Sequence, residues 1–257
     1  MTSKSLNSSQ QRKKWVWFHR FGSPAWVYGF AGRWATPSGL VALALFGWGL
    51  YQGLVVAPPD YQMGDSYRII FIHVPSAWLS MFSYFVMALS AGIGLVWHIK
   101  VADMVARSIA PLGAMFTFCA LLTGSLWGKP TWGTYWVWDA RLTSELVLLF
   151  LFIGYMALSG AIEDRRTASR ASAVLALIGV VNLPIIHFSV EWWNTLHRGS
   201  TITKLGRPSM DTRMLIPLLI VFFAFNFYFV SAVLNRLRCE LLDQERRTQW
   251  VREIVHG

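Results

Sequence analysis

The chain has 257 residues, of which 54% are hydrophobic and only 14% are charged, and its mean hydropathy is +0.42. A soluble domain of this length normally carries about a quarter charged residues, so the composition favours a membrane protein. The net charge of +10 does not indicate a nucleic-acid binder, because no basic stripe with interleaved aromatic residues lies within a soluble segment. The two cysteines, Cys119 and Cys239, have no metal-binding spacing, and the lack of a Cys-x-x-Cys-His motif excludes a c-type cytochrome.

Six apolar runs have about the length that a membrane-spanning helix requires. The first could pass for a signal peptide, but it starts far from Met1, and Pro58 follows where cleavage would have to occur, so we interpret it as a retained helix. In chain order the runs are 38–57, 69–97, 109–127, 142–162, 171–190 and 214–235.

Three prolines, Pro75, Pro184 and Pro217, bear on how the second, fifth and sixth runs are interpreted. Pro75 is expected in the first turn of the second helix, where a missing N–H costs nothing, and this places His73 just outside the helix or at its mouth. Pro184 and Pro217 should kink the last two helices or open a turn, unless neighbouring helices satisfy the backbone.

The six runs divide the chain into an interfacial N-terminal extension (1–37), a six-helix membrane domain (38–235) and a tail (236–257). Of the 23 lysines and arginines, 16 lie in the two terminal segments and in the connections 98–108 and 163–170. Basic residues favour the cytoplasmic side, so both termini are predicted to be cytoplasmic. The connections 58–72, 128–142 and 191–213 then face outward. The four basic residues of the last connection oppose the rule, and they could instead meet an anion.

The second outward connection includes the segment 127–139, in which four tryptophans and a tyrosine occur within thirteen residues. Aromatic residues at the edge of an apolar run can simply anchor a helix at the membrane boundary. Alternatively, Trp132 and Trp136 stand four apart and Trp138 follows, so a short helix lying flat would present an aromatic shelf. Such a shelf suits a large flat apolar ligand.

The pattern Trp-Gly-x-x-x-Trp-Gly-x-x-Trp-x-Trp-Asp at 127–139 resembles the WWD signature of haem-handling proteins. Its continuation, Ala-Arg-Leu-Thr-Ser-Glu-Leu, is similar to the CcmC family of bacterial cytochrome c maturation. Two further blocks match this family, Ser-Tyr-Arg-Ile-Ile-Phe-Ile-His-Val-Pro at 66–75 and Val-Asn-Leu-Pro-Ile-Ile-His-Phe-Ser-Val-Glu-Trp-Trp-Asn-Thr-Leu-His at 181–197. The resemblance covers roughly residues 35–235.

This resemblance implies an all-α protein of six transmembrane helices in the bacterial inner membrane, with a haem platform between two outer loops on the periplasmic face. Haem b would be bound non-covalently, with His73 and His197 as the two axial ligands of the iron. His187 matches a family position that is not assigned to iron. Trp127, Trp132, Trp136, Trp138 and Asp139 would form the platform.

The resemblance also favours Arg68 and Arg141 as partners of the two haem propionates, since guanidinium groups meet carboxylates bidentately. The alternative for each is an ordinary interfacial charge, or an ion pair between Arg141 and Asp139. Asp139 and Glu145 could be an acid–base pair, but their positions at a helix start indicate a cap and a favoured acid.

The implied function is delivery of haem to the chaperone CcmE, in a complex with the ABC transporter subunits CcmA and CcmB and the small membrane protein CcmD. ATP hydrolysis is expected in a partner, so the chain itself is not expected to be an enzyme. Two alternatives stay open. A transmembrane haem transporter would need ionisable residues inside the spans, which are almost absent. A cytochrome c synthetase-like enzyme would resemble longer relatives with additional spans.

Overall fold

The computed structural model describes residues 22–193 and 210–256, which are almost entirely helical and contain no strand within those ranges. Two short turns of other helix types, a π-helical turn (Gln52–Val56) and a 3-10 turn (Asp65–Ile69), flank the first connection. The α-helices are α2 (Pro24–Tyr51), α3 (Ile70–Trp97), α4 (Lys100–Trp132), α5 (Ala140–Ala161), α6 (Arg165–Gly179), α7 (Asn182–Trp192), α8 (Thr212–Gln244) and α9 (Gln249–His256).

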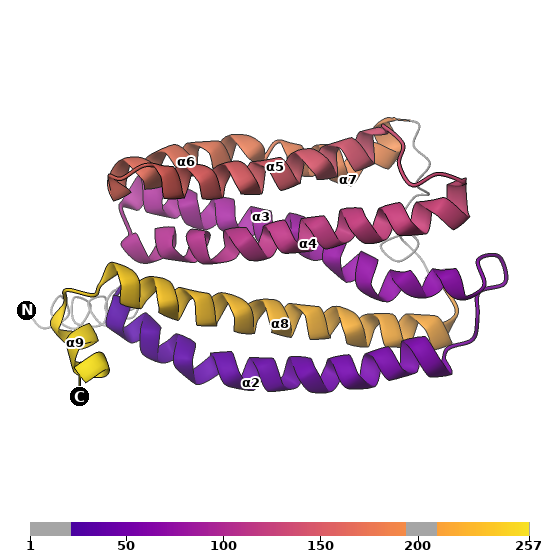
Figure 1. The fold of residues 1–257 in the computed structure, drawn as a ribbon, viewed down its shortest axis with the longest axis horizontal. Coiled ribbons are helices and arrows are strands. Elements are labelled where there is room, and N and C mark those ends of the chain that lie inside the picture. The colour runs from indigo at the N-terminus through magenta and orange to yellow at the C-terminus, as the bar shows by residue number, and fades with distance from the viewer. Residues whose placement is uncertain (1–21, 194–209, 257) are drawn as a thin grey trace, which may run out of the picture.

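Six helical stretches in the described ranges are long and apolar enough to cross a membrane, which confirms the predicted all-α fold with six spans. The long helices form three layers (Figure 1): α2 pairs with α8, α3 packs on α4, and α5 packs on α6 and α7. The central α3–α4 layer contacts both others, since α8 packs on α3 and α4, while α5 and α6 pack on α4 and α3 respectively.

The main core lies between the central layer and the α5–α6 layer. Its largest side chains include several with no exposed surface, and the rings of Tyr84 and Phe152 meet edge to face with centroids 5.0 Å apart. Leu79, Phe116 and Leu148 complete its centre. Because the core joins α3, α4 and α5, it fixes how these helices lie relative to one another.

The α2–α8 pair is held differently, by close backbone approach. The buried face of α2 carries small residues, among them Ala31, Ala35 and Gly49, and the Ser231 hydroxyl of α8 donates to the Ala35 carbonyl at 2.7 Å. A Cβ atom at Gly49 would lie 2.8 Å from a Val221 methyl group, so only glycine fits this contact. Small residues of this kind let helices pack where hydrophobic burial provides no driving force.

Several helix ends differ from the sequence-based prediction. α2 begins at Pro24, well before residue 38, and α4 begins at Lys100 and continues to Trp132. The hydropathy criterion missed these turns because helices continue past the apolar part of their sequence. The division of the chain at residues 37 and 236 stays a prediction, and residues 1–21 lie outside the described residues.

The three prolines behave in three ways. Pro75 is the sixth residue of α3, so it lies beyond the first turn in which it was predicted, and His73 lies within the start of the helix rather than outside it. Near Pro184 the predicted interruption is present, because the fifth span is divided into α6 and α7 at residues 180–181. Pro217 lies within a continuous α8, so no turn opens there.

Candidate functional site

Most of the predicted site residues gather at one end of the bundle, where α4 and α7 end and α3, α5 and α8 begin (Figure 1). We call this the tryptophan end. α2 begins and α8 finishes at the opposite end. Residues from the outward connections, 58–72, 128–142 and 191–213, can therefore meet at the tryptophan end.

His73 lies in the first turn of α3 and faces α4. Its Nδ1 atom is 3.1 Å from the carbonyl oxygen of Ala120 and 3.1 Å from the hydroxyl oxygen of Thr123. Thr123 donates its own proton to the Cys119 carbonyl at 2.6 Å, so its hydroxyl can only accept from the imidazole. Both neighbours of Nδ1 are therefore acceptors, and the neutral ring carries its proton on Nδ1. The lone pair, which binds metals, is left on Nε2.

The backbone of α4 also shapes the space around this ring. A Cβ atom at Gly124 would lie 3.0 Å from Cε1 of His73, and the Trp127 ring meets the imidazole edge to face with centroids 5.8 Å apart. Sequence reasoning missed Ala120, Thr123 and Gly124. Their spacing with Trp127 along one face of α4 was the available signal, but it cannot be distinguished from ordinary helix packing without knowing that α3 covers that face.

The tryptophan segment is not the short flat helix expected. Trp132 is the last residue of α4, and Gly133 ends that helix with a left-handed φ of 80° while its N–H donates to Lys129. Trp136 and Trp138 follow on a stretch without regular secondary structure, and their rings meet edge to face with centroids 5.4 Å apart. Trp138 is 75% exposed. The chain therefore reverses at a glycine turn, and an aromatic pair follows it.

Two indole groups in this segment are buried but unsatisfied. The Nε1 atoms of Trp127 and Trp136 have no hydrogen-bond partner among the described residues. A buried indole N–H normally has an acceptor, and for these two atoms it would have to come from a bound group or from outside the described residues. Asp139, by contrast, caps α5 by accepting from the Leu142 N–H at 2.8 Å, as predicted.

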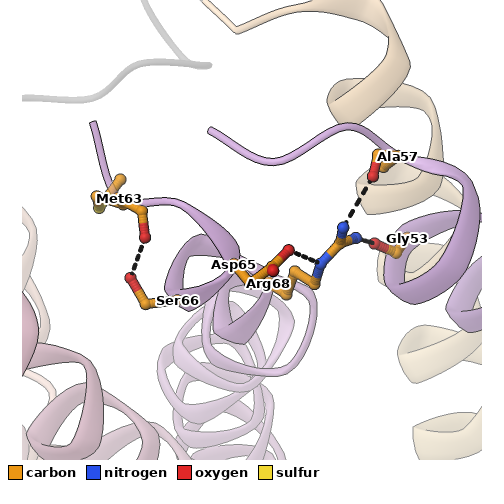
Figure 2. A network of polar contacts seen from close by, with 6 residues as sticks. All are labelled: Gly53, Ala57, Met63, Asp65, Ser66 and Arg68. Atoms are coloured by element: carbon orange, nitrogen blue, oxygen red, sulfur yellow. Dashed lines mark hydrogen bonds and ion pairs between the residues drawn. The ribbon is translucent and has the colours of Figure 1, made fainter. Parts of the chain in front are cut away.

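Arg68 is largely occupied by internal contacts (Figure 2). Its Nε atom donates to Asp65 at 2.9 Å, Nη2 donates to the Ala57 carbonyl at 2.9 Å, and Nη1 donates to the Gly53 carbonyl. It thereby joins the end of the first span to the beginning of the second. Its side chain is only 18% exposed. The three bonds use three of the five N–H bonds of the guanidinium, which leaves two for another partner.

Arg141 lies in the first turn of α5, half-buried, between two acids. Its charge interacts with Glu145, one turn further along the helix, and with Asp139. Glu145 is only 8% exposed, and its Oε1 atom has no hydrogen-bond partner among the described residues. The sequence indicated Glu145 only as an acid favoured by a helix start, and its burial was not foreseen.

The three candidate histidines separate in the structure. His73 joins the tryptophan end as described, and His197 lies outside the described residues. His187 is exposed on α7, where its ring contacts Phe188 with centroids 4.7 Å apart. No cluster of three His, Cys, Asp or Glu side chains that could hold a bare metal ion occurs in the described ranges.

Comparison with known proteins decides the family. The model of the family described as Heme exporter protein C, or CcmC, matches residues 17–252. The chain belongs to the CcmC family.

The chain matches two bacterial relatives over nearly their whole length and a mitochondrial relative over three quarters of its length. Heme exporter protein C of Escherichia coli K12 is 51% identical over 244 residues, which cover 94% of this chain and 97% of the relative. The protein of the same name from Haemophilus influenzae is 47% identical over 241 residues, covering 94% and 98%. A putative ccmC-like mitochondrial protein of cytochrome c biosynthesis from Marchantia polymorpha is 43% identical over 178 residues, covering 69% and 75%. The resemblance found in the tryptophan segment is therefore confirmed along most of the chain.

Proposed function

We propose that this protein binds haem at the tryptophan end and hands it on for cytochrome c maturation. The names of its relatives, heme exporter protein C and a protein of cytochrome c biosynthesis, support this role. The observation that carries the proposal is the pair of acceptors at His73 Nδ1, which leaves the metal-binding lone pair on Nε2. A backbone carbonyl that accepts from one ring nitrogen, and so fixes the tautomer, is typical of histidines that bind a metal through the other nitrogen.

Each part of the site has a role in this proposal. His73 and His197 bind the iron of haem b from its two faces, and the tryptophans cover the apolar surface of the macrocycle. The indole N–H groups of Trp127 and Trp136, which lack partners among the described residues, would be satisfied by the bound group. Arg141 meets a propionate, and the remaining N–H bonds of Arg68 are available to the other.

The tryptophan end faces the periplasm in this proposal. The support is the excess of lysine and arginine in the segments that the six spans place at the opposite end. The protein then lies in the bacterial inner membrane, with both termini cytoplasmic and the haem on the outer side.

Hand-over requires partners. We propose that the acceptor is the haem chaperone CcmE, and that CcmA, CcmB and CcmD form the associated ABC-transporter complex. The sequence carries no phosphate-binding glycine loop, so the energy for release would come from the ATP-hydrolysing partner.

The absorption spectrum of the purified protein tests the proposal. We expect wild-type protein to show the low-spin spectrum of iron with two imidazole ligands. His73→Gly and His197→Gly should each lose it and recover part of it when imidazole diffuses into the hole. His187→Gly is the matched control, and it should keep the spectrum, because His187 lies on the exposed face of α7. A colourless wild-type preparation from haem-replete cells would contradict haem binding. If imidazole restored the spectrum only in His187→Gly, then His187, and not His73 or His197, would be an iron ligand.

A further inference from the structure

The last described helix, α9, carries two branched apolar side chains that are open to the surroundings. Ile254 is 49% exposed and Val255 is 61% exposed, whereas Val251, one turn earlier, is only 4% exposed. These three residues share one face of the helix, because side chains three and four positions apart are neighbours. The apolar face of α9 is therefore buried at its start and open at its end.

The start of α9 is docked on α2. The rings of Trp250 and Tyr28 lie 5.6 Å apart, measured between their centroids. On its own side, the Arg238 guanidinium of α8 lies over the Tyr28 ring at 4.6 Å and donates to the Tyr28 hydroxyl at 3.0 Å. Tyr28 thus joins three helices, and it holds α9 at the end of the bundle opposite the tryptophan end (Figure 1).

This part of α2 has the aromatic residues of a membrane boundary. Phe30 is 41% exposed and Trp34 is 50% exposed, and the rings of Trp26 and Phe30 stack with centroids 5.4 Å apart. Exposed aromatic rings near the end of a spanning helix typically lie at the level of the lipid headgroups. Because Trp250 contacts Tyr28 in the same turns of α2, α9 lies at about this level.

The charges around α9 favour an anionic surface. Its arginines, Arg246, Arg247 and Arg252, are exposed and form no ion pair with other described residues. The neighbouring acids already have partners: Asp243 pairs with Arg165 at 3.1 Å, Glu245 lies 4.0 Å from Lys100, and Glu253 accepts from Gln249 at 2.8 Å. Exposed cations beside an open apolar face are typical of helices that lie on anionic membranes.

We propose that α9 lies in the headgroup region of the bilayer and binds anionic phospholipids. Ile254 and Val255 insert toward the lipid tails, and the three arginines contact the headgroup phosphates. Lipid is the partner, rather than an acidic protein, because the open apolar face lies at the depth where lipid surrounds the bundle. The inference is independent of haem binding, since it concerns the opposite end of the molecule.

A fluorophore that reports polarity tests the insertion. With Cys119 and Cys239 replaced, the full-length protein carries nitrobenzoxadiazole at Ile254→Cys or at Glu253→Cys, in nanodiscs of phosphatidylcholine with or without phosphatidylglycerol. We expect blue-shifted emission at position 254, and a larger shift when phosphatidylglycerol is present. Emission at position 253 should stay water-like, because Glu253 lies on the other face of α9.

Amide hydrogen exchange in residues 249–256 tests the charges. Exchange in the wild type should be slower when phosphatidylglycerol is present, since each arginine near an anionic surface favours the bound state roughly fivefold. Arg247→Gln with Arg252→Gln should therefore reduce this slowing by about 25-fold. Arg166→Gln with Arg170→Gln is the matched control. It removes the same charge from exposed positions of α6 at the same end of the bundle, and it should leave exchange in α9 unchanged (Figure 1).

Three outcomes overturn the inference. Water-like emission at position 254 in both lipid mixtures, or an equal blue shift at position 253, would contradict insertion of the apolar face. Equal exchange with and without phosphatidylglycerol would exclude anionic lipid as the partner. An equal effect of the α6 variant would mean that only the net charge of the protein matters, and not the arginines around α9.

Discussion

At the scale of single residues, the His73 ring lies close to the backbone of α4 at Gly124. An added Cβ would lie 3.0 Å from Cε1 of the imidazole, closer than side chains normally pack. We therefore expect Gly124→Ala to shift the ring slightly, and Gly124→Val to displace it and to weaken or abolish the low-spin haem spectrum. The measurement is the absorption spectrum and haem content of each purified variant.

Gly160→Ala is the matched control, because nothing lies within 4 Å of an added Cβ at that position of α5. It should keep the spectrum and stabilise its helix by about 0.5–1 kcal/mol. A wild-type spectrum in Gly124→Val would show that His73 does not bind the iron from this orientation.

The sequence could identify His73 as a candidate but could not give its tautomer. The two acceptors that hold the Nδ1 proton lie 47 and 50 residues away along the chain. They become neighbours only when α3 packs on α4. Similarly, the sequence shows Glu145 near a helix start, but its burial follows from the packing of α5 against its neighbouring helices.

At the scale of elements, Arg68 connects two helices. Its bonds to the Gly53 and Ala57 carbonyls hold the π-helical end of the first span against the start of the second (Figure 2). We expect Arg68→Lys to release these carbonyls, because an ammonium group cannot reproduce the planar fork of guanidinium. Amide hydrogen exchange in the connection 57–64 should then accelerate.

Haem and its dimethyl ester, in which both propionates are blocked, distinguish the roles of the two arginines. If Arg68 acts mainly by joining the two helices, Arg68→Lys should weaken both ligands equally, whereas Arg141→Gln should weaken haem alone. Unchanged exchange together with a selective loss of haem would instead make Arg68 chiefly a propionate ligand.

The elements were predictable in number but not at their ends. Apolar runs locate the spans, but Lys100 and Lys129 lie inside α4, where a hydropathy criterion stops short. The spacing of Trp132 and Trp136 suggested one helical face, and Gly133 overrides it, because glycine readily takes the left-handed conformation that ends α4. A turn residue between two periodic positions is thus stronger evidence than their spacing.

At the scale of the whole molecule, the six spans place the tryptophan end and the connection between α5 and α6 on opposite sides of a membrane. With Cys119 and Cys239 replaced, we expect Thr131→Cys to react with an impermeant maleimide in intact spheroplasts and Thr167→Cys to stay unlabelled. Both positions are exposed, and the reason is the excess of basic residues on the predicted cytoplasmic side.

Lysis before labelling is the control, since it should make both cysteines reactive. Labelling of residue 167 in intact cells, with residue 131 silent, would invert the orientation. The tryptophan end would then face the cytoplasm, and delivery of haem to a periplasmic chaperone from this site would be excluded.

The three-layer arrangement itself could not be predicted from the sequence. Hydropathy gives the spans in order but not their partners, and the α2–α8 pair joins helices from opposite parts of the chain through small residues and one hydroxyl bond. Such residues carry no strong sequence signal, because alanine and glycine are also frequent where no helix packs.

The pairing of α2 with α8 also delays completion of the bundle during biosynthesis. About 160 residues separate the end of α2 from the start of α8, and a ribosome needs roughly 10–30 s to add them. Throughout this interval the small-residue face of α2 has no native partner in the bilayer, although the central helices can already associate. A nascent chain is therefore most open to wrong helix partners, and to membrane proteases, before its last span inserts. The bundle closes only after the whole membrane domain has been made.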